Sequence, residues 1–141
     1  MLKKTIFFDL FGVLLGWSIT GFKPLKPTSL LQGLSNYHLL YIISNTSNGQ
    51  INVLKNKFDF FQYFTKIFTS ETIGHNKPDL TIFKYALQEA KTSPNQSIFI
   101  DDSLQNTQSA ATLGIVSNHY IGEKELIKFF EDQEILVPNK N

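Results

Sequence analysis

The chain has 141 residues, of which 42% are hydrophobic, 18% are charged and 13 are Phe, and its formal net charge is +1. This length and composition are typical of one globular domain with a substantial core, and they exclude a disordered or fibrous chain. The small net charge favours neither a nucleic-acid partner nor a membrane surface, and the lack of Cys excludes disulfides, a thiolate nucleophile and a zinc–thiolate site.

The first half of the chain is predicted to contain two buried strands. Both are apolar without alternation, which is the pattern of parallel strands covered on two faces. Gly and Pro residues between them predict a loop and a short helix. The predicted elements are a strand at 5–8, a loop at 16–28, a helix at 29–34 capped by Thr28 or Ser29, a strand at 39–43, a turn at 45–49 and a helix at 50–57.

The second half continues the alternation of strand and helix. Its predicted elements are an aromatic loop or short helix within 58–68, a strand at 66–68, a helix from Pro78 to about Ala90, a strand at 97–100, a helix at 103–113 ended by Gly114, a strand beginning at 115–116, a helix at 123–131 and a frayed tail at 137–141. No repeat or linker interrupts this pattern. We therefore predict a single capless core domain over 1–141, a Rossmann-like three-layer α/β/α fold with a mostly parallel five-stranded sheet.

The N-terminal segment indicates where the protein resides. Residues 1–8 have a charged start but only a short apolar run, which predicts a first strand and not a signal peptide. No apolar stretch approaches the ~18 residues that cross a bilayer. We expect a cytoplasmic protein without a membrane partner.

Polar residues follow the predicted strands in a characteristic order. Asp9 follows the first strand, Ser44 the second, Lys77 comes after the third, and Asp101 with Asp102 follows the fourth. Ligands of open α/β sheets bind outside the carboxyl ends of the strands. The order therefore predicts one crevice with a nucleophile, a hydroxyl, an amine and two further carboxylates, which suits a site that handles phosphoryl groups.

These four segments resemble the motifs of the haloacid dehalogenase-like (HAD) hydrolase superfamily. The matching stretches are FFDLFGVL at the first strand, IISNTS at the second, NKPD before a helix and IFIDDSLQN at the fourth strand. The resemblance extends from Thr5 to about Phe130. The third and fourth segments look most like the dehalogenase and epoxide-hydrolase-like branch, whose members usually carry a helical cap.

The resemblance implies a catalytic carboxylate and a magnesium site. Asp9 takes the place of the family's nucleophile, which forms an aspartyl-phosphate. Mg²⁺ would be held by Asp9, by the backbone carbonyl of Phe11 and by Asp102, with Asp101 in support, since hard divalent cations take oxygen ligands. Asn106 stands where many relatives have a further acid, which implies a weaker contact there.

The resemblance also implies groups that hold the substrate. Lys77 would offset the clustered negative charge and keep the nucleophile ionised. The Ser44 hydroxyl would donate a hydrogen bond to the transferring group. Backbone amides would do the same near Phe11, Gly12 and Asn45.

Phe11 departs from the pattern of the family's phosphatases. They place a second Asp there as general acid and base, and losing such a group typically costs about 10²–10⁴-fold in rate. Activated acyl or aryl phosphates would suffer less. Dehalogenases of the family tolerate an aromatic residue at this position, but they use an Arg for the substrate carboxylate, and this chain has none.

The intervals between Asp9, Ser44 and Lys77 leave no room for the usual cap beyond the core elements. An open site implies a large phosphorylated substrate, a second subunit that closes the crevice as in a homo-oligomer, or a site that no longer turns over. The sequence offers no specific nucleic-acid signal.

Three functions therefore stand beside the main hypothesis, a slow Mg²⁺-dependent phosphatase. The first is a pseudoenzyme that binds a metal, an anion or a protein. The second is a 2-haloacid dehalogenase, which the lack of Arg disfavours. The third is a receiver-type domain. A receiver-type phospho-acceptor domain requires that the strand at 97–100 does not neighbour the strand at 5–8. His38, His75 and His119 are predicted to be surface or packing residues, and Trp17 with the aromatics of 58–68 is predicted to belong to the core.

Overall fold

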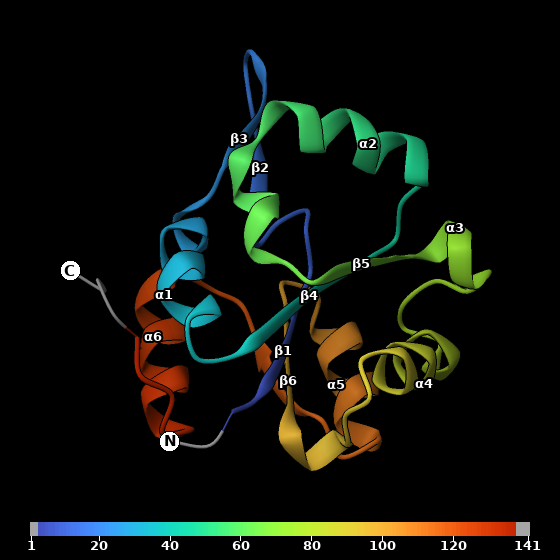
Figure 1. Ribbon diagram of the computed structural model, residues 1–141, viewed down its shortest axis with the longest axis vertical. Helices are drawn as coiled ribbons and strands as arrows, with labels where there is room; N and C mark the ends of the chain where they lie inside the picture. Colours follow the sequence, from blue (N-terminus) through green and yellow to red (C-terminus); the bar gives the residue numbers. More distant parts are fainter. Residues whose placement is uncertain (1–2, 138–141) are drawn as a thin grey trace.

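Five parallel strands form the central sheet of the protein, which the computed structural model describes over residues 3–137 (Figure 1). The strand order is β5-β4-β1-β6-β7, and every neighbouring pair is parallel. The bounds are β1 Thr5–Phe8, β4 Leu39–Ser44, β5 Lys66–Thr69, β6 Ser97–Asp101 and β7 Val116–His119. This arrangement confirms the predicted Rossmann-like α/β class and its mostly parallel five-stranded sheet.

Helices cover both faces of the sheet, because successive strand residues point to opposite sides. Ile6 and Phe8 of β1 belong to one buried cluster, whereas Phe7 belongs to another. The first cluster packs against α1 (Leu31–Ser35), α2 (Asn48–Lys57) and α6 (Glu123–Asp132); the second packs against α4 (Leu80–Glu89) and α5 (Leu104–Thr112) (Figure 1). The short α3 (Ser70–Ile73) follows β5. The three predicted layers are therefore present.

A two-stranded antiparallel hairpin replaces most of the loop predicted at 16–28. It consists of β2 (Leu15–Ser18) and β3 (Gly21–Pro24), with Trp17 opposite Phe22. The loop prediction was wrong because Gly and Pro were taken only as breakers, although Gly21 supplies the positive φ of +116° at the end of the hairpin turn. The hairpin stands outside the main sheet, so Trp17 is 72% exposed and not in the core as predicted.

Three helix starts differ from the predictions. A 3₁₀ turn (Lys26–Leu30) precedes α1, and Thr28 and Ser29 donate back to the carbonyls of Leu25 and Lys26 without capping the helix. Helix α4 begins at Leu80 and not at Pro78, because the Asp79 carboxylate caps it by accepting from the Thr81 amide at 2.8 Å. Helix α2 begins at Asn48, inside the turn predicted at 45–49, because the Ser47 hydroxyl caps it by accepting from the Gln50 amide. Helices α5 and α6 agree with the predicted segments to within one residue at each end.

The remaining segments include two further 3₁₀ turns, Asp59–Tyr63 and Pro94–Gln96. Phe60 and Phe61 in the first of these are buried, which confirms the core prediction for the aromatic stretch. Val137 is also buried, contrary to the fraying predicted from 137 onwards, and the rest of that predicted tail, 138–141, lies outside the described residues.

Candidate active site

Three adjacent strands bring the predicted polar residues to one edge of the sheet. β1 lies between β4 and β6, and Phe8 is in register with both Ile42 and Ile100. Asp9 therefore emerges beside the last residues of its two neighbours, and its amide donates to the Ile100 carbonyl at 2.8 Å. Because β6 neighbours β1, the condition that would have favoured a receiver domain is not met.

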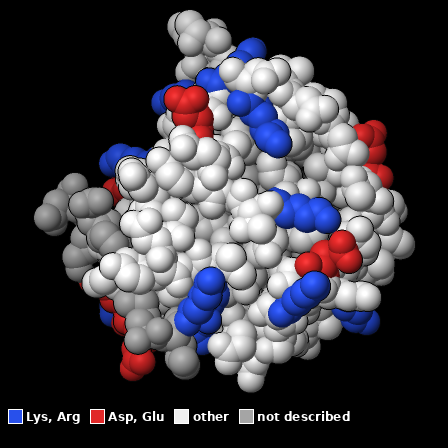
Figure 2. Space-filling view, viewed as in Figure 1, with Lys and Arg blue, Asp and Glu red and all other residues white. Residues whose placement is uncertain are grey.

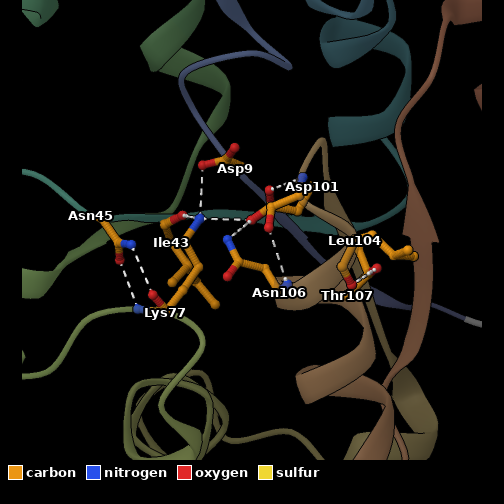
Figure 3. Close-up of polar contacts among 9 residues, drawn as sticks. Asp9, Ile43, Asn45, Lys77, Asp101, Leu104, Asn106 and Thr107 are labelled. Atoms are coloured by element: carbon orange, nitrogen blue, oxygen red, sulfur yellow. Dashed lines mark hydrogen bonds and ion pairs between the residues drawn. The ribbon is translucent and has the colours of Figure 1, made fainter.

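The Lys77 side chain joins the ends of these strands (Figure 3). Its ammonium donates to Asp9 Oδ1 at 2.7 Å, to Asp101 Oδ2 at 2.9 Å and to the Ile43 carbonyl at 2.8 Å. Only 2% of the Lys77 side chain is exposed. The three donors of the ammonium thus each meet an oxygen, which is the condition for burying such a charge.

The Asn45 side chain fixes the backbone of the loop that carries Lys77 (Figure 3). Its Oδ1 accepts from the Lys77 amide at 2.8 Å, and its Nδ2 donates to the Lys77 carbonyl at 3.1 Å. The family motifs implied only a backbone amide role for Asn45, so this paired contact was missed. An Asn directly after a strand-ending Ser is a weak local signal, since its partner is 32 positions away.

Asp101 accepts hydrogen bonds from three residues. In addition to Lys77, its Oδ2 accepts from Asn106 Nδ2 at 3.0 Å, and its Oδ1 accepts from the Ser103 amide at 2.8 Å. Ser103 itself caps α5. Asn106, which stands where many relatives have a further acid, thus supplies a donor to the carboxylate and adds no negative charge.

Asp102 completes a group of three carboxylates that could hold a metal ion. One oxygen from each of Asp9, Asp101 and Asp102 lies within 4.8 Å of the others, and Asp102 is the exposed member. The backbone of Gly12 makes this approach feasible, because a Cβ there would lie 2.2 Å from Asp102 Oδ2. The all-oxygen donor set fits a hard cation such as Mg²⁺.

Burial dominates the electrostatics of Asp9. It raises the pKa of the Asp9 carboxyl from 3.8 to about 8; Lys77 acts in the opposite direction, and the charge of Asp101 adds to the rise. Lys77 thus favours the ionised form of Asp9, as expected of it, but its effect is smaller than that of burial. A divalent cation at the three carboxylates would favour the charged form, so the metal and Lys77 would have to act together.

The predicted phosphate-binding donors are only partly available. The Ser44 hydroxyl is buried, and within residues 3–137 its Oγ has no hydrogen-bond partner, which leaves it free to serve a ligand oxygen. The Gly12 amide, by contrast, donates to the Leu15 carbonyl at 2.8 Å. In this arrangement Gly12 contributes a close approach for Asp102 and no free donor.

The three histidines lie in different environments. His38 is buried and accepts from the Lys4 amide at 3.0 Å, and His75 pairs with Asp79 at 3.1 Å. Both are packing or surface residues, as predicted. His119 is exposed, as predicted, and its Nε2 lies 3.0 Å from the backbone carbonyl of Asp102.

Charged side chains outside the site are dispersed over the face that Figure 2 shows, with uncharged surface between the Lys residues. Within residues 3–137, no helix has the length and apolar character needed to cross a bilayer.

Two fungal proteins are similar to this chain in sequence. The chain is 39% identical over 98 residues to the drimenol cyclase drtB of Aspergillus calidoustus, covering 70% of this chain and 18% of that enzyme. It is 32% identical over 95 residues to the sesquiterpene phosphatase astK of Aspergillus oryzae, covering 67% and 48%. The chain thus spans about half or less of the length of these relatives.

The fold is shared with a HAD family enzyme of Bacteroides thetaiotaomicron whose structure holds magnesium and inorganic phosphate. The TM-score is 0.72 at 21% identity, and the match covers 83% of this chain and 93% of that one. The sequence pattern of haloacid dehalogenase-like hydrolases matches residues 26–118. Together with the fold and the strand-end site, this match shows that the chain belongs to the haloacid dehalogenase-like hydrolase family.

Proposed function

We propose that this protein is a Mg²⁺-dependent phosphatase that uses Asp9 as its nucleophile and works slowly or only on activated phosphates. The close grouping of Asp9, Asp101 and Asp102, with the buried Lys77 bridging Asp9 and Asp101, is the observation that carries the proposal. Similarity to a sesquiterpene phosphatase supports the reaction class. The substrate is a phosphorylated compound, and the activity is proposed for a chain shorter than the relatives it matches.

The residues suit magnesium in their chemistry and placement. Asp9 and Asp102 would be direct ligands with the Phe11 carbonyl, while Asp101, already held by three donors, would support them. Bound Mg²⁺ would neutralise charge on the phosphoryl oxygens. Because Gly12 has no Cβ, the Asp102 carboxylate can lie against the loop that follows the nucleophile.

The reaction would proceed in two displacements at phosphorus. A carboxylate oxygen of Asp9 attacks the phosphorus, the new O–P bond forms, and the P–O bond to the leaving group breaks with its electron pair on that oxygen. Water then attacks the aspartyl-phosphate, releasing inorganic phosphate and restoring Asp9. Lys77 would stabilise the developing negative charge, and Ser44 would donate to a phosphoryl oxygen.

Phe11 limits the range of leaving groups. It carries no proton to give to a departing alkoxide, so the first displacement depends on the intrinsic quality of the leaving group. Acyl phosphates and aryl phosphates leave as weakly basic anions and need no such donor. We therefore propose activity on these substrates, with a large substrate or a second subunit covering the open crevice.

A catalytically impaired binding module is the second candidate, and Phe11 is the observation that favours it. Such a protein would keep its affinity for metal and phosphate because the carboxylates and Lys77 are intact. It would differ from the phosphatase only in the absence of turnover.

Phosphate release from acetyl phosphate, with and without Mg²⁺, tests both candidates. The phosphatase predicts Mg²⁺-dependent turnover that is lost in Asp9→Asn and retained in Asp59→Asn, which removes a carboxylate elsewhere in the chain. Flat Mg²⁺ dependence or an active Asp9→Asn protein would refute it. A Mg²⁺-dependent rise in Tm without turnover, together with activity in Phe11→Asp, would identify the binding module.

A further inference from the structure

A pocket of about 490 Å³ adjoins the candidate active site on the side of the β2–β3 hairpin. Phe11, Gly12 and Asn45 line it, and all three belong to the segments that follow the catalytic strands. The pocket therefore borders the place where the phosphoryl group would be bound, although Asp9, Lys77 and Asp102 do not line it. A substituent on that group has direct access to it.

The outer wall of the pocket is aromatic. The rings of Trp17 and Phe22 are stacked with centroids 4.1 Å apart, and the Phe11 ring lies 5.3 Å from that of Phe22. Trp17 remains 72% exposed although it is large and apolar. An exposed aromatic stack beside a catalytic centre offers apolar area that a ligand could cover.

The lining of this pocket carries no charged side chain among the described residues. Its polar members are the amides Asn45 and Gln50, and Asn45 is already committed to the Lys77 backbone. A sugar phosphate or a second phosphate would find no cation here to pair with its charge and few free donors for its hydroxyls. A hydrocarbon group has no hydrogen bonds or ion pairs to lose on entering the pocket, and it would bury apolar surface there.

We propose that this pocket binds the leaving group of the activated phosphate, and that this group is apolar: an aryl ring or the hydrocarbon chain of an acyl group. The proposal rests on the proposed phosphatase function and assigns its substrate class. Phe11 then contributes to substrate binding, because its ring, at the position where the family's phosphatases carry a second Asp, forms part of the aromatic wall. Trp17 and Phe22 are specificity residues that contact the leaving group and take no part in the displacement.

Binding of three phosphonates tests the proposal independently of turnover, because their C–P bond is not hydrolysed in this way. Methyl-, butyl- and octylphosphonate present the same head group with chains of rising length. Measured by calorimetry in the presence of Mg²⁺, Kd should fall by about tenfold or more from the methyl to the octyl compound. Trp17 is the only Trp of the chain, so its fluorescence should shift with octylphosphonate and not with methylphosphonate.

The variant Trp17→Ala should reduce the octyl-to-methyl preference to about threefold or less. Its side chain is exposed, so folding should survive, and a Tm measurement checks this. Tyr37→Ala, which removes a 47% exposed aromatic residue that does not line the pocket, should keep the full preference.

Equal Kd values for the three phosphonates in the wild-type protein, or an unchanged preference in Trp17→Ala, would overturn the proposed pocket role. The acetyl phosphate assay separates this outcome from failure of the proposed function, since acetyl phosphate brings no hydrocarbon chain. Turnover of acetyl phosphate without a chain-length preference rejects the pocket alone. A preference that depends on Trp17, found without turnover, supports the pocket and rejects the phosphatase.

Discussion

Replacing Lys77 by Met tests whether the buried ammonium holds the site together. Met preserves much of the side-chain volume but removes the charge that lies 2.7 Å from Asp9 and 2.9 Å from Asp101. Both carboxyl groups stay buried, since Asp9 is 7% exposed and Asp101 is 1% exposed. Removing one partner from such a network costs about 3–5 kcal/mol in the free energy of unfolding.

The cost should depend on pH, because the Asp9 carboxyl can lose its charge by taking up a proton. The folded-state pKa of Asp9 is already raised to about 8, so the folded protein binds more protons than the unfolded chain between about pH 4 and 8. Stability therefore falls as pH rises through this window. Without Lys77 the pKa rises further, so the loss caused by Lys77→Met should be larger at pH 8 than at pH 5.

Urea denaturation of both proteins at pH 5 and pH 8, without metal, measures the two losses. Lys66→Met is the matched control, since Lys66 is 53% exposed in its side chain and pairs with Glu89 at 3.4 Å. Such exposed pairs contribute about 0–1 kcal/mol. A loss for Lys77→Met that equals the control at pH 8, or that does not change with pH, would refute the reasoning.

Three further changes address the carboxylates and the elements that position them. Gly12→Ala should weaken Mg²⁺ binding in calorimetry by about tenfold or more, because the new Cβ displaces Asp102 from the ligand group. Asp9→Asn should remove most of the fall in stability between pH 4 and 8 and should be more stable than the wild type at pH 8, as measured by thermal unfolding. Asn45→Ala should lower the free energy of unfolding by about 1–3 kcal/mol in urea, since both backbone groups of Lys77 lose their partner.

Each of these has a control or an opposing result. Gly21→Ala shares the positive φ but meets no atom within 4 Å, so it should leave Mg²⁺ affinity intact. Retention of the full pH dependence in Asp9→Asn would mean that another group carries it. An Asn45→Ala protein as stable as the wild type would show that the Lys77 loop needs no anchor.

Much of the candidate site could be predicted from short stretches of sequence. β1 and β6 are apolar runs that end at an acid, and this local pattern carries both the strand and the position of the polar residue. A parallel strand buried on both faces has little freedom in composition, so its apolar run is unmistakable. The acids Asp9, Asp101 and Asp102 were found in this way, and the structure brings them together.

The hairpin could not be predicted in the same way. Its pairing depends on contact between Trp17 and Phe22, and its Gly and Pro residues are typical of loops as well as of turns between strands. Aromatic residues usually indicate a core, but the Trp17 side chain of this hairpin is 72% exposed. The pocket beside the active site therefore became visible only when the hairpin was placed in space.

By itself, the sequence determined which side chains stand at the ends of the strands and hence which chemistry is available, because strand, turn and following residue are neighbours along the chain. Tertiary structure alone decided the pKa of Asp9 and the hydrogen-bond partners of these side chains. The raised pKa of Asp9 arises from burial. The three hydrogen bonds of the Lys77 ammonium and the hydrogen bond from the Lys77 amide to Asn45 join residues that are distant in sequence. Desolvation and hydrogen-bond geometry depend on what surrounds an atom, and only the folded chain supplies those surroundings.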